Sequence, residues 1–129
     1  MGRKASLAKQ RSTITHVAAI CDQVDFQRAL PHVILVGENQ VTKTKLAALR
    51  RAAPPGVHIW RYKTGWMTTA IMVRYVRLLG RCLKKFHLLL RFILYMDALR
   101  AHTNPAVLRA APGVDLCVCV IPGKWTWAL

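Results

Sequence analysis

One aspartate, Asp97, has a position in the sequence that favours binding of a metal ion. Asp97 directly follows the apolar segment 92–96, which we expect to be a strand, so its carboxylate would lie at the carboxyl end of that strand. Ligands bind at such ends in open α/β sheets. A divalent cation would neutralise the carboxylate there while contacting phosphate oxygens. Asp97 is therefore our candidate metal ligand and catalytic residue; the alternative is that it only caps the following turn.

A second group of side chains has the right charge to bind phosphate. Five cations recur at helical spacing in the stretch that begins at Thr68, with no acid among them: Arg74, Arg77, Arg81, Lys84 and Lys85. At about 100° per residue they fall on one face of a helix. This face is either a solvated surface or a nucleic-acid contact, and both interpretations stay open on the pattern alone.

The charge of the whole chain favours a polyanionic partner. Its 129 residues contain 20 Lys and Arg but only 5 Asp and Glu, a formal net charge of +15. Nucleic acid is the expected partner, because neutralised phosphates release counterions, and an anionic membrane surface is the rival. No glycine-rich phosphate loop and no Ser/His/Asp spacing is found, so nucleophilic catalysis has no support.

The four cysteines lack the paired spacing of a metal site or a disulfide framework, so we expect free thiols in a reducing compartment. Cys117 and Cys119 are expected to be buried strand residues. Residues 1–10 are expected to form a disordered basic tail. Transit-peptide and Gly2 myristoylation patterns also fit this stretch, although both occur often by chance. Neither a secretory signal nor a transmembrane segment is expected, since the apolar segment 88–96 is too short.

Periodicity and breakers predict an α/β layered domain. Strands are predicted at 12–21, 33–36, 57–62, 88–96 and 115–121, and helices at 44–53, from Thr68 onward and from Asn104 to Ala111. The second of these helices has an apolar face made of Met72, Tyr75, Val76, Leu79 and Leu83. Since the last two strands flank a helix, they should run parallel. The length allows one domain over residues 1–129.

Several segments together carry a resemblance to a known family. Residues 95–102 resemble the strand-Asp-x-x-x-x-His motif of DDE-superfamily endonucleases and transposases of the pogo, Tigger and Jerky type. Further segments resemble that family's motifs in the same order: a basic-x-x-Thr strand at 11–15, Leu-Pro-x-Val-Ile at 30–34, Ala-Trp-Met-Thr at 65–68, and a strand with a Pro-x-x-x-Thr loop at 113–129.

The resemblance implies a ribonuclease H-like α/β fold and a nuclear, DNA-binding protein without a small-molecule substrate. The family site holds three carboxylates and two Mg²⁺ (or Mn²⁺) ions, which act in phosphodiester cleavage and strand transfer. Asp97 matches the second carboxylate. His102, five residues later, could orient a phosphate or a water molecule of the outer coordination shell, although a structural histidine is favoured. The other two carboxylates, and with them the first catalytic strand and the C-terminal helix, have no match in this chain. We therefore expect an incomplete domain that is inactive or weakly active.

Further expectations concern the stability of the chain, its tryptophans and its class of protein. The lost first strand would lie beside the strand of Asp97, so unpaired ladder groups and instability are expected. Trp66, Trp125 and Trp127 could stack on unpaired bases, although packing is favoured for Trp66.

Two other functional classes stay open for this protein. One is a small basic RNA- or DNA-binding protein without catalysis. The other is a membrane-surface protein that uses its apolar segment 86–96 and a myristoyl group on Gly2.

Overall fold

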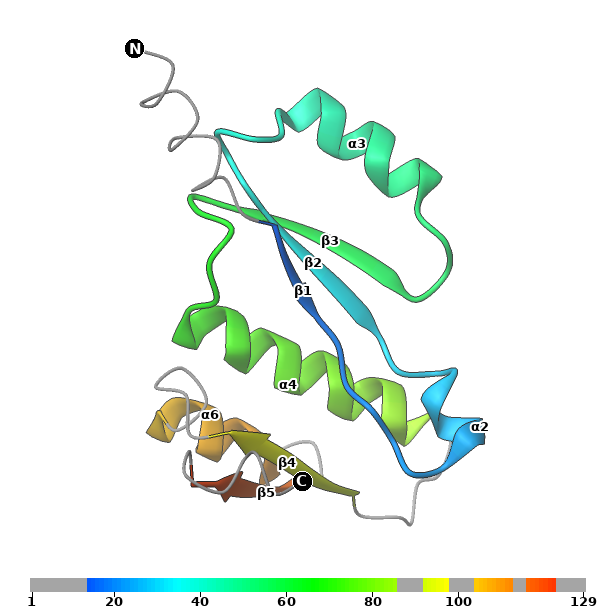
Figure 1. Ribbon diagram of the computed structural model, residues 1–129, viewed down its shortest axis with the longest axis vertical. Coiled ribbons are helices and arrows are strands. Elements are labelled where there is room, and N and C mark those ends of the chain that lie inside the picture. The colour runs from blue at the N-terminus through cyan, green and yellow to red at the C-terminus, as the bar shows by residue number, and fades with distance from the viewer. Residues whose placement is uncertain (1–13, 86–91, 98–103, 113–115, 123–129) are drawn as a thin grey trace. The chain divides into compact units, whose positions relative to one another are not determined.

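The computed structural model describes residues 14–85, 92–97, 104–112 and 116–122, and within them the protein is mixed α/β with two small sheets and four helices (Figure 1). Contacts divide the chain into two compact units. Unit 1 comprises Met1–Ile20 and Pro31–Trp66, and unit 2 comprises Cys21–Leu30 and Met67–Leu129. The expectation of one domain over residues 1–129 stays a prediction.

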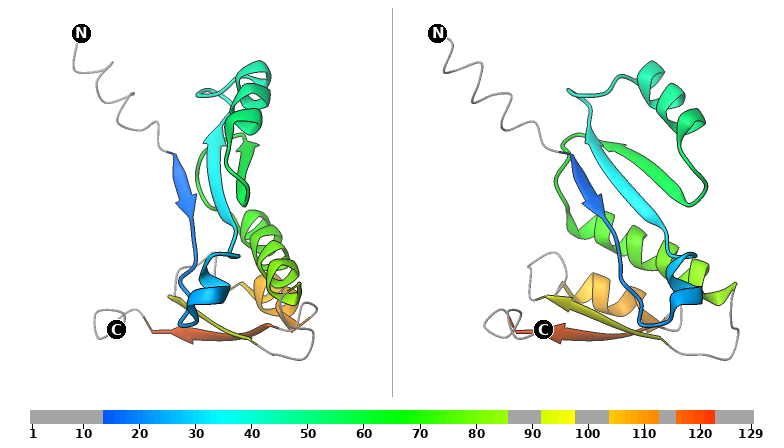
Figure 2. Two further views of the ribbon diagram at one scale, coloured as in Figure 1. Left: turned by 90° about the vertical axis from the view of Figure 1, so that its right-hand side faces the viewer. Right: turned by 45° about the vertical axis from the view of Figure 1, so that its right-hand side comes forward.

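Unit 1 is built on a three-stranded sheet in the order β1-β2-β3 (Figure 2). β1 (Thr15–Val17) runs antiparallel to β2 (His32–Gly37), and β2 runs parallel to β3 (Val57–Tyr62). The predicted strands at 33–36 and 57–62 are thus confirmed. Short apolar runs bounded by turn-forming residues predicted them well.

The first predicted strand is much shorter than expected, three residues instead of ten. Val17 is the last residue of β1 and pairs with Val33 of β2. Continuing that register would place Ala19 opposite Pro31, which has no N–H to donate to a ladder. The partner strand therefore sets the end of β1, which the Thr- and Val-rich composition of 12–21 did not reveal.

A basic helix covers the outer edge of this sheet. α3 (Lys43–Ala52) begins at Thr42, whose side-chain oxygen accepts a hydrogen bond from the Lys45 backbone N–H at 3.2 Å. Near its end, Arg50 donates from Nε and Nη2 to the carbonyl oxygen of Ile59, at 3.1 and 2.9 Å. Since β3 is the last strand of the sheet, this pair of bonds satisfies a carbonyl that has no neighbouring strand.

Unit 2 holds the longest helix and a parallel strand pair. α4 (Thr69–Lys84) is followed by β4 (Phe92–Asp97), α6 (Pro105–Ala110) and β5 (Leu116–Ile121), and α4 packs on α6. Both helix starts were predicted: Thr68 accepts a hydrogen bond from the Ile71 N–H at 3.3 Å, and Asn104 accepts one from the Ala106 N–H at 2.9 Å. The parallel pairing of β4 with β5 is likewise confirmed.

The short helix α2 (Val24–Gln27) was not predicted, because its sequence has the polar character of a turn. It has no side-chain N-cap bond, and its helical stretch is only four residues long. Its Phe26 ring meets the ring of Phe92 in β4 edge to face, with centroids 5.5 Å apart. This long-range contact helps hold the helix in place, and no local pattern reports it.

The apolar face predicted for α4 is buried throughout, but it carries one unsatisfied group. The hydroxyl of Tyr75 has no hydrogen-bond partner, and it is the one such buried side-chain atom in the described residues. Burial, together with the nearby Cys82, raises the pKa of Tyr75 to about 12. A buried hydroxyl without a partner costs about 1–3 kcal/mol.

Tyr75→Phe should therefore stabilise the protein by about 1–3 kcal/mol at neutral pH, since the ring is kept and the orphan hydroxyl is removed. The pH dependence has a definite sign. Unfolded tyrosine loses its proton near pH 10 and folded Tyr75 near 12, so the Tyr75 hydroxyl should cost the wild type further stability between these values, and the variant should lack this contribution. Urea unfolding at neutral and alkaline pH measures both effects. A destabilised variant would contradict the unsatisfied hydroxyl.

Candidate functional site

Asp97 lies where the sequence predicted it, at the carboxyl end of a parallel strand. It is the last residue of β4 and pairs with Ile121, the last residue of β5, so both strands end at the same edge of the sheet. Its side chain is exposed. The position is therefore open to a ligand from solvent, as expected of a strand end in an α/β sheet.

The residues described do not by themselves make a magnesium site around Asp97. No group of three or more His, Cys, Asp or Glu side chains that could hold a metal occurs in the described ranges. Mg²⁺ requires six ligands in near-octahedral geometry, and one carboxylate leaves most of them to water. His102, expected in the outer shell, lies outside the described residues. We therefore derive no metal-dependent step for this chain.

The five candidate phosphate-binding cations are all exposed on α4 and directly after it. The opposite face of the helix is buried, so burial separates the two faces as the sequence pattern predicted. From Arg74 to Lys84 the helix rises about 15 Å, which matches roughly four base pairs of duplex. Arg81 and Lys84 also lie in the last turn, where positive charge is favoured by the helix dipole.

A half-buried thiol lies next to this basic face without being activated by it. Burial raises the pKa of Cys82, and the neighbouring Lys85 and Arg81 only partly oppose that increase. The reactive form of cysteine is the thiolate, so a raised pKa keeps Cys82 unreactive. The chemistry available on this face of α4 is thus binding of anions by charge.

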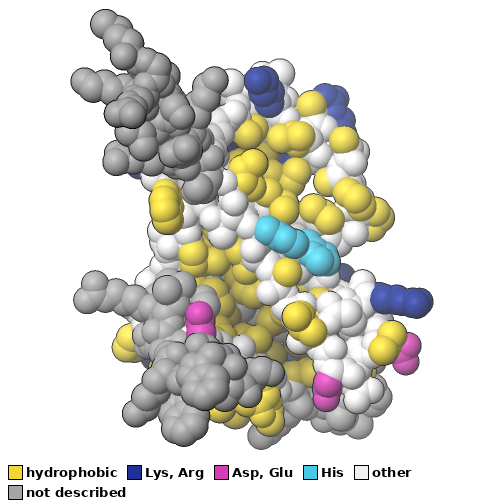
Figure 3. All heavy atoms as spheres, in the orientation of Figure 1, with side chains coloured by type: hydrophobic (Ala, Val, Ile, Leu, Met, Phe, Trp, Pro, Cys, Tyr) yellow, Lys and Arg dark blue, Asp and Glu magenta, His cyan; other side chains and the backbone are white. Residues whose placement is uncertain are grey.

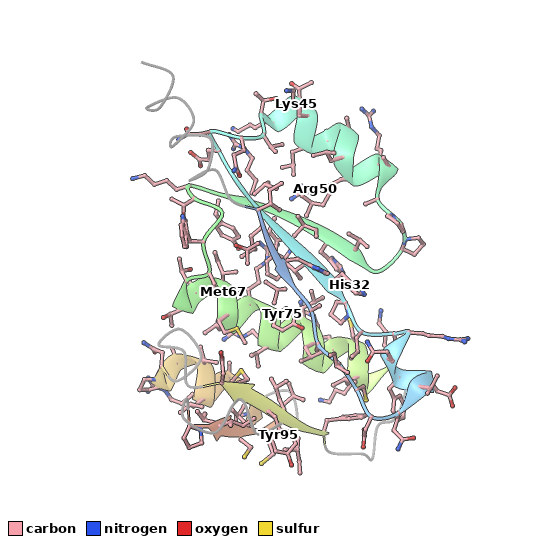
Figure 4. The ribbon with its side chains drawn as sticks, in the orientation of Figure 1. His32, Lys45, Arg50, Met67, Tyr75 and Tyr95 are labelled. Carbon is pink, nitrogen blue, oxygen red and sulfur yellow. The ribbon has the colours of Figure 1, made fainter. Side chains whose placement is uncertain are left out.

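α3 carries a second set of cations, which the sequence analysis did not single out as candidate binding residues. All four cations of α3 are exposed, and Arg50 among them is engaged with the Ile59 carbonyl. Figure 4 labels Lys45 and Arg50 on this helix. The others are Lys43 and Arg51. No residue of α3 is fully buried. Lys43, Lys45 and Arg51 together carry the same charge as three arginines of α4. Substituting them therefore provides a matched control for net charge.

Two expectations about packing are wrong. Cys117 and Cys119 are exposed, although the four cysteines are free thiols as predicted. Their strand alternates, and Leu116 is the residue of β5 that is buried, which turns both sulfurs to the other face. Trp66, expected to pack, is 61% exposed. Trp125 and Trp127 lie outside the described residues.

The exposed face of the β4–β5 pair is unusually apolar. Ile93 pairs with Cys117 and Tyr95 with Cys119, and all four side chains are exposed. Tyr95 is labelled in Figure 4. Met96 and Leu116 are buried instead. Which set of alternate residues would face outward could not be predicted from the sequence, because both sets in β4 and β5 are largely apolar.

Comparison with known proteins found no relative. No protein-family model, no curated protein and no solved structure matches this chain. The likeness to DDE endonucleases therefore depends on the motifs in the sequence alone. In the part of the chain that is described, no helix has both the length and the apolar character needed to span a bilayer.

Proposed function

We propose that this chain is a DNA-binding domain derived from a DDE-type transposase, with a ribonuclease H-like fold, and that it binds DNA without cleaving it. The observation that carries the proposal is the exposed, acid-free row of cations on α4, Arg74 to Lys85, opposite a fully buried apolar face. A nuclear location follows from the proposed partner.

The charge of the molecule supports a backbone contact to nucleic acid. With a net charge of +15, the chain has far more positive charge than a small domain needs to remain in solution. Each cation that neutralises a phosphate releases condensed counterions, so binding should be strong at low salt and should weaken steeply as salt is added. Contacts of this kind position a protein on DNA without reading its sequence.

The strand arrangement within each unit supports the family assignment. In unit 2, the order α4, β4, α6, β5 places Asp97 at the end of the first of two parallel strands. Within the described residues, β4 pairs only with β5, and β1 pairs only with β2. The resemblance expects a further strand beside the one that bears Asp97. An open edge on β4 is what such a fold would have where that strand is not supplied.

The proposal separates binding from catalysis, and Asp97→Asn tests this separation. We expect the variant to bind DNA as the wild type does, because the substitution leaves all five α4 cations in place. We also expect no Mg²⁺-dependent nicking by either protein, since one carboxylate cannot hold the two ions of this chemistry. Gel shift and nicking of supercoiled plasmid, with and without Mg²⁺, measure both properties. Wild-type nicking that is lost in Asp97→Asn would overturn the inactivity.

The same purified chain distinguishes the proposal from its rivals. A membrane-surface protein should float with anionic vesicles even when excess DNA is present, whereas the proposed function requires DNA to compete the chain off such vesicles. A small RNA-binding protein should prefer an RNA hairpin to duplex DNA at equal salt. Either result would replace the DNA-binding proposal with the rival that it favours.

A further inference from the structure

Two histidines from neighbouring strands of unit 1 meet at the protein surface. Nε2 of His16 in β1 lies 3.0 Å from Nδ1 of His32 in β2. His16 is exposed and His32 is half-buried. Histidine side chains gather at the surface in the space-filling view (Figure 3), and His32 projects from β2 in Figure 4. Neither residue has a role in the proposed function.

The two rings meet edge to edge through their nitrogens. Their planes are inclined by only 25°, and their centroids are 5.3 Å apart. A ring nitrogen lies about 1.2 Å from the ring centre, so two rings that point at each other across a 3.0 Å contact have roughly this centroid separation. The contact is therefore an in-plane N–H···N hydrogen bond, in which one nitrogen donates and the other presents its lone pair.

The sheet register holds this arrangement in place. His16 pairs with Ile34, so His32 is its diagonal neighbour on the same face of the antiparallel pair. Both Cα positions are held by the ladder, and only side-chain torsions remain to be ordered when a ligand binds. Two imidazoles presented in this way form a preorganised chelate, which lowers the entropic cost of binding.

We propose that His16 and His32 bind one divalent transition-metal ion, of the Zn²⁺, Ni²⁺ or Cu²⁺ class, through Nε2 and Nδ1 respectively. Imidazole is a preferred ligand of these ions. The proton of the shared hydrogen bond moves to the far nitrogen of its own ring, so two neutral histidines offer two lone pairs and no net proton is lost. With metal–nitrogen distances of about 2.0–2.1 Å, tetrahedral geometry separates the nitrogens by roughly 3.3 Å. The nitrogens need to separate by only a few tenths of an ångström, and each ring has to turn by roughly 35° so that its lone pair leaves the N···N line and points at the ion. Water completes the coordination.

This site is independent of the proposed DNA binding and of Asp97. Mg²⁺ is a hard cation that prefers oxygen ligands, so it should not compete for two imidazoles. No third His, Cys, Asp or Glu joins the pair in the described residues, so the site holds two protein ligands. Binding should therefore be reversible, with the ion exchanging between the protein and solution.

Zn²⁺ titration of the full chain labelled in its histidine rings, followed by NMR at about pH 7.5, tests the proposal. We expect the ring signals of His16 and His32 to shift together, with one midpoint and one equivalent of Zn²⁺. Mg²⁺ should move neither signal. In His16→Thr, Zn²⁺ should bind at His32 at least about tenfold more weakly, because the chelate is lost. Zn²⁺ bound by the four thiols would leave these ring signals in place.

His58→Thr is the matched control. His58 in β3 pairs with Val33, the residue after His32, so its side chain lies on the other face of the sheet. This variant should retain both the joint shift and the Zn²⁺ affinity of the wild type. Independent midpoints for His16 and His32, no shift of either ring, or an equal loss of affinity in His58→Thr would overturn the proposal. The pair would then be a structural hydrogen bond only.

Discussion

Replacing Arg74, Arg77 and Arg81 together by glutamine should reduce DNA affinity by about two to three orders of magnitude at roughly 0.1 M salt. The estimate assumes that each arginine neutralises one phosphate. The slope of log K against log salt concentration should then decrease by about 2.7 in magnitude, since each phosphate contact contributes about 0.9. Fluorescence anisotropy of a labelled duplex over a salt series measures the affinity and the slope. All three side chains are exposed, so the fold should be retained.

The triple variant Lys43→Gln, Lys45→Gln, Arg51→Gln is the control for net charge. It removes the same three positive charges, but from exposed positions on α3, and it leaves the Arg50 contact to Ile59 intact. If the face of α4 makes the contact, this control should lose little affinity and keep nearly the wild-type slope. Equal losses in the two triple variants would mean that overall charge, and not the α4 face, attracts DNA.

Leu79→Ala should destabilise the protein by about 2–5 kcal/mol, because it deletes a buried side chain and leaves a cavity. Leu79 is 2% exposed and lies on the buried face of α4, opposite the cations. Since small domains are stable by only about 5–15 kcal/mol, a loss of this size removes a large fraction of the total. Urea unfolding followed by circular dichroism measures it, and DNA binding should fail as unfolding sets in.

Leu49→Ala makes the same change at an exposed helical position. Leu49 is 43% exposed on α3, and alanine is at least as good a helix former, so the change in stability should stay within about 0.5 kcal/mol. A similar effect of the two substitutions, or a loss below about 1 kcal/mol in Leu79→Ala, would show that Leu79 does not belong to a packed core.

The two faces of α4 are expected to have different roles. The apolar face of α4 is expected to determine stability, and the basic face is expected to determine binding. Tyr75 lies on the buried face, and its unsatisfied hydroxyl marks a place where the core is less stable than its apolar pattern suggests. Combining Tyr75→Phe with the Arg74, Arg77 and Arg81 substitutions should improve stability without restoring DNA affinity.

Elements with local signals could be predicted from the amino-acid sequence. α4 was predicted with its N-cap and both of its faces, because a repeat of three and four residues maps directly onto one side of a helix. β3 was predicted with its observed bounds, since Pro54-Pro55-Gly56 ends the preceding helix and a polar stretch follows Tyr62. Asp97 was placed at a strand end for a similar reason: the apolar run stops there.

Features that depend on contacts between residues far apart in the chain could not be predicted in this way. Pro31, just before the neighbouring strand β2, explains where β1 ends, the ring of Phe92 helps hold α2, and the burial of Leu116 explains why Cys117 and Cys119 face solvent. The contact between His16 and His32 arises from the register of two strands, which no local pattern specifies. In each case the deciding interaction joins segments whose pairing is set by the packing of the whole unit, and a window of sequence carries no information about its partner.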